Sequence, residues 1–311
     1  MDLRQLEYIT AIEDFGNMTE AAAHLYVTPS ALNQQLLKLE KSIGMPLFVR
    51  GHRFMMPTPA GRIWIDSARE ILRVRRNTYT ALSDLAGNYR AEYHLGLAYG
   101  HGNDALLHSY SAFHGRYPGI VLLCRENMVA NQMEELKNGS LDIGMVHITD
   151  AAEQAPDFHY ELLSAENLVL GVPVSHPAAA YGSREPGVLP TADLSLLREE
   201  SFALMQRGST QRARLDPLFV GAGFTPQIIA ESTQNRFLQS LAASQGCCTI
   251  IPQAYATDFE RLAWFALPTH PRFILYAIYL QGLHLPQPMR ELLGMIRSYA
   301  QEHFQFPEPA A

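Results

Sequence analysis

The stretch TEAAAHLYVTPSALNQQLLKLEKSIGMPLF, residues 19–48, decides the fold of the amino-terminal part of the chain. Its alanine-rich start, with an N-cap at Thr19, predicts a compact helix that ends before a turn at Tyr26-Val27. Thr28 then caps a further helix whose first position is Pro29, where proline loses no hydrogen bond. Two short helices around a tight turn are typical of a helix-turn-helix.

The helix after Pro29 has two contrasting faces. Leu32, Leu36 and Leu39 recur at helical spacing and predict the buried face, whereas Ser30, Asn33, Gln34 and Gln35 are polar. Short polar side chains on one face can reach phosphates and base edges in a major groove. The same pattern also suits a small helical bundle whose polar face is only solvated. Periodicity alone leaves both interpretations open.

The segments on either side favour DNA binding. Apolar residues at helical spacing predict a helix over 3–15 that stops at Gly16, and residues 48–56 predict two short strands around a basic tip. Such a hairpin is a wing, whose arginines can touch backbone phosphate. We therefore expect double-stranded DNA to be contacted by the following exposed positions of the helix and the wing: Thr28, Pro29, Ser30, Asn33, Gln34, Lys38, Arg50 and Arg53.

The charge distribution permits this hypothesis without proving it. Residues 1–90 hold 11 Lys and Arg against 9 Asp and Glu, which gives +2, whereas residues 91–311 hold 13 against 22, which gives −9. Phosphate contacts depend on local clusters of arginine and lysine more than on such totals. Only the amino-terminal part is suited to approach DNA.

The compartment is inferred from what the sequence lacks. The first residues carry acidic side chains and no basic stretch before an apolar core, so we expect no signal peptide. The longest strongly apolar stretch, 273–280, is far too short to span a membrane. Cys124, Cys247 and Cys248 have no metal-ligand or disulfide spacing. These features predict a cytoplasmic protein.

The remainder of the chain predicts an α/β domain. After a long helix over 60–85 that ends at Gly87-Asn88, short apolar runs alternate with helical stretches. We expect strands at 93–97, 120–124, 142–146, 168–172, 202–205, 227–230, 249–251 and 273–280. We expect helices at 104–117, 130–138, 211–222 and 235–244.

Several linked motifs of the amino-terminal region resemble the LysR-type transcriptional regulators. The motifs are Ala21-Ala22-x-x-Leu25, Thr28-Pro29-Ser30-Ala31-Leu32-Asn33, Leu39-Glu40, Gly44-x-Pro46-Leu47-Phe48-x-Arg50 and Thr58-x-Ala60-Gly61. Motifs linked at fixed spacing are far more specific than any single one. The chain departs from the family at Asn33, where serine is more usual, and at Gln34 and Leu37, where basic residues are common. The preferred DNA sequence therefore stays open.

The resemblance extends more loosely over the rest of the chain and implies its organisation. It implies a winged helix-turn-helix over 1–58, a dimerising linker helix over 59–88 and, over 89–311, a two-lobed α/β effector domain like periplasmic binding proteins. Lobe one would comprise about 89–163 and 266–303, and lobe two about 164–265. It also implies a homodimer or homotetramer that modulates transcription, with RNA polymerase as a possible further partner.

Ligands of open α/β lobes bind at the carboxyl ends of strands, where helix N-termini offer free N–H groups. Three loops and one strand end meet this description, and their residues are compatible with a small carboxylate. The predicted effector contacts are Tyr99, Gly100, His101, Gly102, Asn103, His147, Ser209, Thr210 and Thr233. Ser209 and Thr210 could instead serve only as helix caps, and the glycines only a tight turn.

The sequence disfavours two other classes of protein and one further role. An enzyme is disfavoured because the sequence has no nucleophile elbow, phosphate loop, dinucleotide fingerprint or metal-ligand cluster, so we expect no catalytic residue, metal or cofactor. A solute-binding protein is disfavoured by the helical head. Redox sensing by the adjacent Cys247 and Cys248 is disfavoured because their apolar setting predicts inert thiols. The sequence thus predicts a DNA-binding transcriptional regulator with a small-molecule effector.

Overall fold

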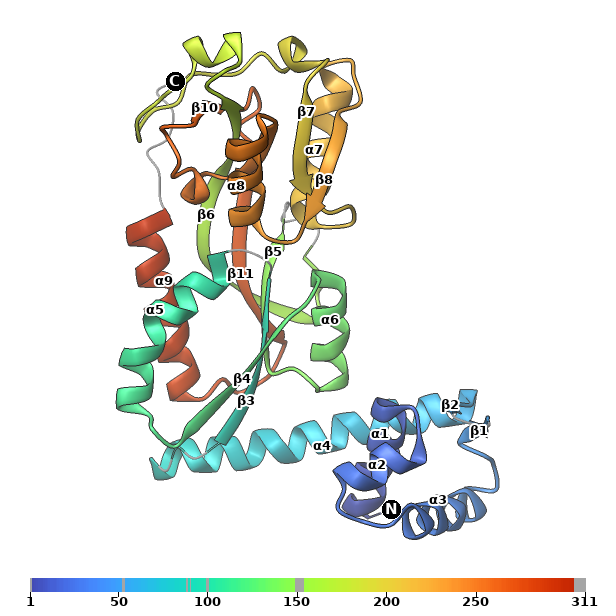
Figure 1. Ribbon diagram of the computed structural model, residues 1–311. Helices are drawn as coiled ribbons and strands as arrows, with labels where there is room; N and C mark the ends of the chain where they lie inside the picture. The colour runs from blue at the N-terminus through green and yellow to red at the C-terminus, as the bar shows by residue number, and fades with distance from the viewer. Residues whose placement is uncertain are drawn as a thin grey trace. The chain divides into compact units, whose positions relative to one another are not determined.

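The computed structural model describes residues 2–51, 54–87, 89, 91–98, 101–148 and 154–304, and leaves the side chains of Arg50, His101, Gly102 and Phe304 undescribed. The chain divides into two compact units, Met1–Asn88 and Tyr89–Ala311. Figure 1 shows the elements of each unit, which are described separately below.

The first unit begins with three helices, α1 (Leu3–Phe15), α2 (Met18–His24) and α3 (Pro29–Ile43). The prediction of an N-cap at Thr19 is wrong. Asn17 caps α2, because its side-chain oxygen accepts a hydrogen bond from the backbone N–H of Glu20 at 2.8 Å. Thr19 therefore lies inside the helix. The predicted cap of α3 is confirmed, since the Thr28 hydroxyl accepts from the Ala31 N–H at 3.2 Å.

A hairpin of two short strands follows, β1 (Phe48–Arg50) and β2 (Met55–Pro57), with Val49 opposite Met56. Glu40 holds the entry to this hairpin, because its carboxylate accepts from the backbone N–H groups of Leu47 at 2.7 Å and Phe48 at 3.3 Å. The wing is thereby tied to α3.

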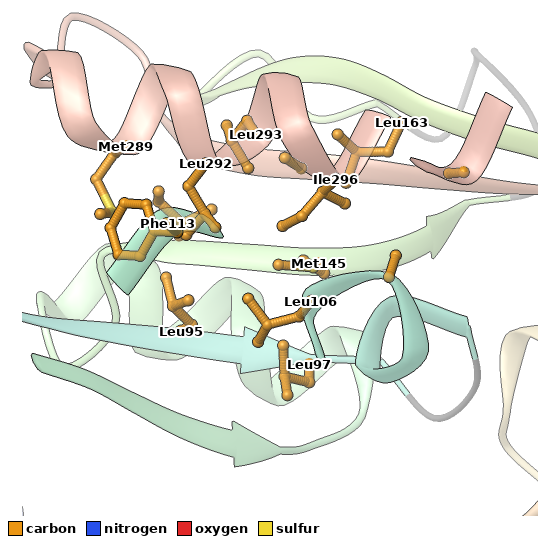
Figure 2. Close-up of a cluster of buried hydrophobic side chains, with 14 of the residues drawn as sticks. Leu95, Leu97, Leu106, Phe113, Met145, Leu163, Met289, Leu292, Leu293 and Ile296 are labelled. Carbon is orange, nitrogen blue, oxygen red and sulfur yellow. The ribbon is translucent and has the colours of Figure 1, made fainter. Parts of the chain in front are cut away.

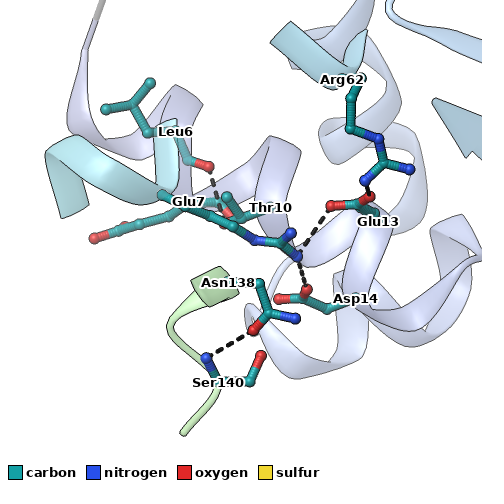
Figure 3. A network of polar contacts seen from close by, with 9 residues as sticks. Leu6, Glu7, Thr10, Glu13, Asp14, Arg62, Asn138 and Ser140 are labelled. Atoms are coloured by element: carbon teal, nitrogen blue, oxygen red, sulfur yellow. Dashed lines mark hydrogen bonds and ion pairs between the residues drawn. The ribbon is translucent and has the colours of Figure 1, made fainter. Parts of the chain in front are cut away.

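Helix α4 (Pro59–Ala86) begins against the wing and ends at Gly87, which has the left-handed φ of +63°. Gly61 permits the close approach at its start, because a Cβ there would lie 1.9 Å from the carbonyl oxygen of Leu47. Ion pairs join α4 to α1. Arg62 contacts Glu13, and Arg69 contacts Glu13 and Asp14; Figure 3 shows Arg62, Glu13 and Asp14 at this junction. The start of α4 is thus fixed to the helical head.

The second unit contains two sheets that share one strand. The 16-residue strand β6 (Phe158–Pro173) pairs with β11 (Arg272–Leu280) up to Asn167, and with β9 (Cys248–Pro252) and β10 (Leu262–Ala266) from Leu168 onward. The first sheet continues from β11 through β5 (Ile143–Ile148) and β3 (Ala91–Leu97) to β4 (Ile120–Glu126). The second continues from β9 through β7 (Ser201–Met205) to β8 (Gln227–Ser232). We call the regions around these sheets lobe one and lobe two.

Both faces of each sheet are covered by helices. In lobe one, Leu95, Met145 and Leu275 pack under α5 (His101–Arg116) and α9 (Gln287–Phe304), whereas Val146 and Ile278 pack under α6 (Val129–Asn138). Figure 2 shows the first of these cores, with Phe113 of α5 beside Leu292 of α9 and Leu106 of α5 near Met145. Adjacent strand residues face opposite sides, so a strand covered on both faces reads as a continuous apolar run.

Lobe two follows the same rule. Phe202 and Leu204 pack with α7 (Thr210–Gly221), whereas the intervening Ala203 packs with α8 (Asn235–Gln245). Three short 3₁₀ helices complete the lobe, at Pro177–Tyr181, Leu194–Leu197 and Gln253–Tyr255. Within the described residues, no helix is long and apolar enough to cross a membrane.

Candidate functional site

The exposed surface of α3 is the candidate nucleic-acid interface. Leu32, Leu36 and Leu39 are buried against α1, α2, the wing and the start of α4. Burial of this leucine stripe fixes which side of α3 faces solvent. The structure places five of the predicted DNA contacts as exposed residues of the helix and its cap: Thr28, Pro29, Ser30, Gln34 and Lys38.

The other predicted DNA contacts are less completely described. Asn33 is half-buried on α3, one residue from the stripe. Arg50 ends β1 without a described side chain, and Arg53 lies outside the described residues. The surface offers hydroxyl, amide and ammonium groups side by side, which together suit base edges and phosphates.

A cavity of about 140 Å³ lies between the two lobes of the second unit. Asn127 to Asn131, at the carboxyl end of β4 and the start of α6, form its lobe-one wall together with Ala98 and His147. Met205 and the residues Gly208 to Gln211, at the start of α7, form its lobe-two wall. Phe273 closes it from β11.

Two helix N-termini open into this cavity. The first-turn N–H groups of a helix have no partner within the helix, and they carry partial positive charge. No side chain caps α6. In α7, the Ser209 hydroxyl accepts from Arg212 N–H at 3.2 Å, and this bond leaves the Thr210 and Gln211 N–H groups for a ligand. Opposed N-termini can therefore hold an anion between the lobes.

Side chains supply an apolar wall and a polar group. His147 is buried and stacks on Phe273, with ring centroids 3.8 Å apart and planes 9° apart. Gln211 is also buried, and its amide donates to Asn235 Oδ1 at 3.1 Å and to the Ile250 carbonyl at 3.0 Å. Its own Oε1 accepts no hydrogen bond from the described residues. A ring of the ligand can pack on His147 and Phe273, which form the apolar wall.

The structure brings together only part of the predicted effector set. His147, Ser209 and Thr210 line the cavity. Asn103 instead donates to Glu126, and neither Asn103 nor Thr233 is among the described lining residues. Tyr99 and Gly100 lie outside the described residues, and His101 and Gly102 begin α5 without described side chains.

Sequence reasoning missed the turn Asn127–Asn131. The signal was present, since the carboxyl end of β4 also leads into a helix, but the strand was predicted to end at Cys124. Phe273 and Met205 gave no local signal. In the described part of the chain no three His, Cys, Asp or Glu side chains gather in a way that could hold a metal ion.

Two family models match the chain. The bacterial regulatory helix-turn-helix protein model of the lysR family matches residues 3–62, and the LysR substrate binding domain model matches residues 86–301. The nitrogen assimilation regulatory protein nac of Klebsiella aerogenes is 27% identical over 88% of this chain and 87% of its own length. The transcriptional dual regulator OxyR of Escherichia coli is 25% identical to this chain, and the match covers 98% of this chain and 97% of OxyR.

Solved structures share the fold. A full-length OxyR variant from Pseudomonas aeruginosa superposes with a TM-score of 0.73 at 21% identity, covering 96% of this chain and 95% of its own. Full-length CbnR complexed with its target DNA gives a TM-score of 0.50 at 22% identity, covering 96% of this chain and all of its own.

Proposed function

Because the chain belongs to the LysR family of bacterial transcriptional regulators, a family of DNA-binding proteins and not of enzymes, we propose specific roles for its two surfaces. Helix α3 enters the major groove, with Ser30, Asn33 and Gln34 on base edges and Lys38 on phosphate. Arg50 and Arg53 of the wing contact the backbone beside the groove. The leucine stripe of α3 carries this assignment, because its burial fixes which face of the helix is available to DNA.

We propose that the effector is a small organic acid. Its carboxylate lies between the N-termini of α6 and α7, and its apolar part packs on His147 and Phe273. The cavity is close in size to one of ~150 Å³ that holds a benzene molecule, so a single ring or a short aliphatic chain fits. Effector binding changes the affinity for DNA only to the extent that the effector binds one arrangement of the lobes more tightly than the other.

The assembly proposed is a homodimer through α4, or a tetramer built from two such dimers. Changes in the lobes would alter the spacing of the DNA-binding heads, and with it DNA bending or contact with RNA polymerase. A protein that acts on chromosomal promoters works in the cytoplasm.

The DNA assignment is tested with a duplex selected from a random-sequence library by the wild-type chain. Ser30→Ala or Asn33→Ala should weaken binding to this duplex by roughly fivefold or more and leave unselected DNA unaffected, because each removes a base contact. Lys38→Ala should weaken both and lower the slope of log affinity against log salt by about one. Arg125→Ala, an exposed cation of the second unit, is the control. Unchanged selectivity in both α3 variants would refute the assignment.

The effector assignment is tested at Ala130, an exposed residue in the first turn of α6 that lines the cavity. Ala130→Asp should stabilise the helix terminus yet repel a carboxylate, whereas Ala130→Asn keeps nearly the same shape without charge. In a calorimetric screen of aromatic and aliphatic monocarboxylates, a ligand of the wild type should lose at least tenfold in affinity for Ala130→Asp only. Equal binding to both variants would place the carboxylate elsewhere.

A further inference from the structure

The turn between α2 and α3 closes in an unusual way. Helix α2 ends in a Schellman motif, in which the Val27 N–H donates to the Ala22 carbonyl at 3.0 Å and the Tyr26 N–H donates to the Ala23 carbonyl at 3.2 Å. This motif places Tyr26 in the left-handed region, with φ at +55°. A residue with a Cβ is disfavoured there, and glycine is usual.

Other helices of this chain show what the position normally requires. Five of them end on a glycine with left-handed φ: Gly16, Gly44, Gly87, Gly139 and Gly246. Among the described residues, only Tyr26 and His270 have positive φ without being glycine. The helix-turn-helix thus carries a bulky residue where the chain elsewhere uses the smallest one.

The tyrosine side chain adds nothing to the packing of the head. It is 97% exposed, and in the described part of the chain it makes no hydrogen bond or ring contact. The two backbone bonds that close the turn do not need a side chain. An unfavourable backbone conformation at a residue that the fold does not use indicates a functional reason for the side chain.

The position of Tyr26 in the helix-turn-helix indicates which part of the DNA its side chain contacts. It lies two residues before Thr28, the cap of α3. In a helix-turn-helix the first helix crosses the DNA backbone and the second enters the major groove, so the turn between them passes the rim of the groove. Phosphates line that rim, and a tyrosine hydroxyl is one of the side-chain donors that bind phosphate oxygens.

We propose that Tyr26 is a DNA contact whose hydroxyl donates a hydrogen bond to a backbone phosphate at the rim of the groove that α3 enters. The contact is independent of base sequence and sets how deeply the N-terminus of α3 sits. A tyrosine carries no charge at neutral pH, so the contact releases no counterion. The inference rests on α3 as the groove-reading helix, which the Ser30→Ala and Asn33→Ala variants test separately.

The test compares Tyr26→Phe and Tyr26→Gly in the full chain, on the selected duplex and on an unselected duplex of equal length. Tyr26→Phe should weaken binding to both by the same factor, roughly tenfold or more, as expected for a lost hydrogen bond to a charged group. The salt slope should stay unchanged, unlike that of Lys38→Ala. Tyr26→Gly should bind at least as weakly, with a thermal midpoint no lower than the wild type, because glycine tolerates the turn. Tyr79→Phe, an exposed tyrosine of α4, is the control.

Each alternative outcome would overturn the proposal. Wild-type affinity in Tyr26→Phe with weak binding in Tyr26→Gly would mean that the ring and not the hydroxyl meets DNA. A loss confined to the selected duplex would mean a base contact. A lower thermal midpoint in Tyr26→Gly would give the ring a structural role, and wild-type affinity in both variants would exclude any contact.

Discussion

At the scale of single residues, burial decides the chemistry of two neighbouring thiols. Desolvation raises the pKa of both Cys247 and Cys248, most strongly for Cys248. The thiolate is the form that peroxide oxidises. We therefore predict that hydrogen peroxide leaves DNA binding unchanged, although relatives of the chain bear the name hydrogen peroxide-inducible genes activator. Binding to the selected duplex before and after peroxide treatment measures this.

A thiol-labelling experiment provides the control. Cys124 is exposed, so the native chain should label rapidly at that position alone, and Cys124→Ser should abolish rapid labelling. Cys247 and Cys248 should react only after unfolding. Any change in DNA binding after peroxide treatment would contradict the prediction. A change that survives in Cys124→Ser but disappears in Cys247→Ser or Cys248→Ser would assign the response to the buried thiols.

Part of the effector cavity was predictable residue by residue. Ser209 caps α7 and Thr210 is its first residue, shortly after strand β7, and both features can be read locally. His147 was predictable as the end of a strand. Phe273 was not, because it reaches the cavity through the pairing of β11 with β5 and β6, which no local pattern reveals. Asn103 met the same local criteria, but its side-chain amide donates a hydrogen bond to Glu126 of β4.

At the scale of elements, one side of α4 exposes large apolar side chains. Ile63, Val74 and Leu85 are spaced by eleven residues, about three helical turns, and 56–87% of each is exposed. Ile65 and Ala68, on the other side of the helix, are buried. We predict that this face pairs with its copy in a dimer. Val74→Glu, which would bury a charge in that interface, should weaken the dimer at least tenfold in sedimentation analysis and reduce DNA affinity. Ala86→Glu, exposed on another side of α4, is the control, and a wild-type dimer in Val74→Glu would exclude this face.

The helices of the head were predictable because each has an apolar stripe and a cap or glycine at its ends. Strand β6 begins at Phe158, but only residues 168–172 were predicted. The first part, residues 158–167, pairs with β11 and was not predicted because it mixes apolar residues with polar ones such as Glu161 and Glu166. Strand β10 and helix α9 were not predicted. The stripe Met289, Leu292, Leu293 and Ile296 of α9 was readable, whereas the short apolar run of β10 is ambiguous without its partner β6.

At the scale of the whole effector domain, an ion pair joins the lobes on the side away from the cavity. Arg236 of α8 lies 3.1 Å from Asp104 of α5, and its guanidinium lies 5.5 Å from the ring centroid of Tyr255. The cavity is bounded by α6 and α7, whereas this pair lies between α5 and α8, which cover the other faces of the sheets. The chain itself connects the lobes through β6 and through the segment that leads into β11. The pair therefore opposes rotation of one lobe against the other.

We predict that Arg236→Ala loosens the lobes without unfolding either. The Arg236 side chain is 74% exposed, and exposed pairs contribute about 0.2–1 kcal/mol, so amide exchange at the cavity walls should rise by at most about fivefold. Exchange within the cores should not change. Arg261→Ala, which breaks a comparably exposed pair with Asp258 inside lobe two, is the matched control. Faster exchange at residues 127–131 and 208–211 in Arg236→Ala alone would identify the pair as a restraint on lobe rotation. Equal exchange in both variants would mean that this ion pair does not restrain the lobes, and that the effector meets no opposition from this contact.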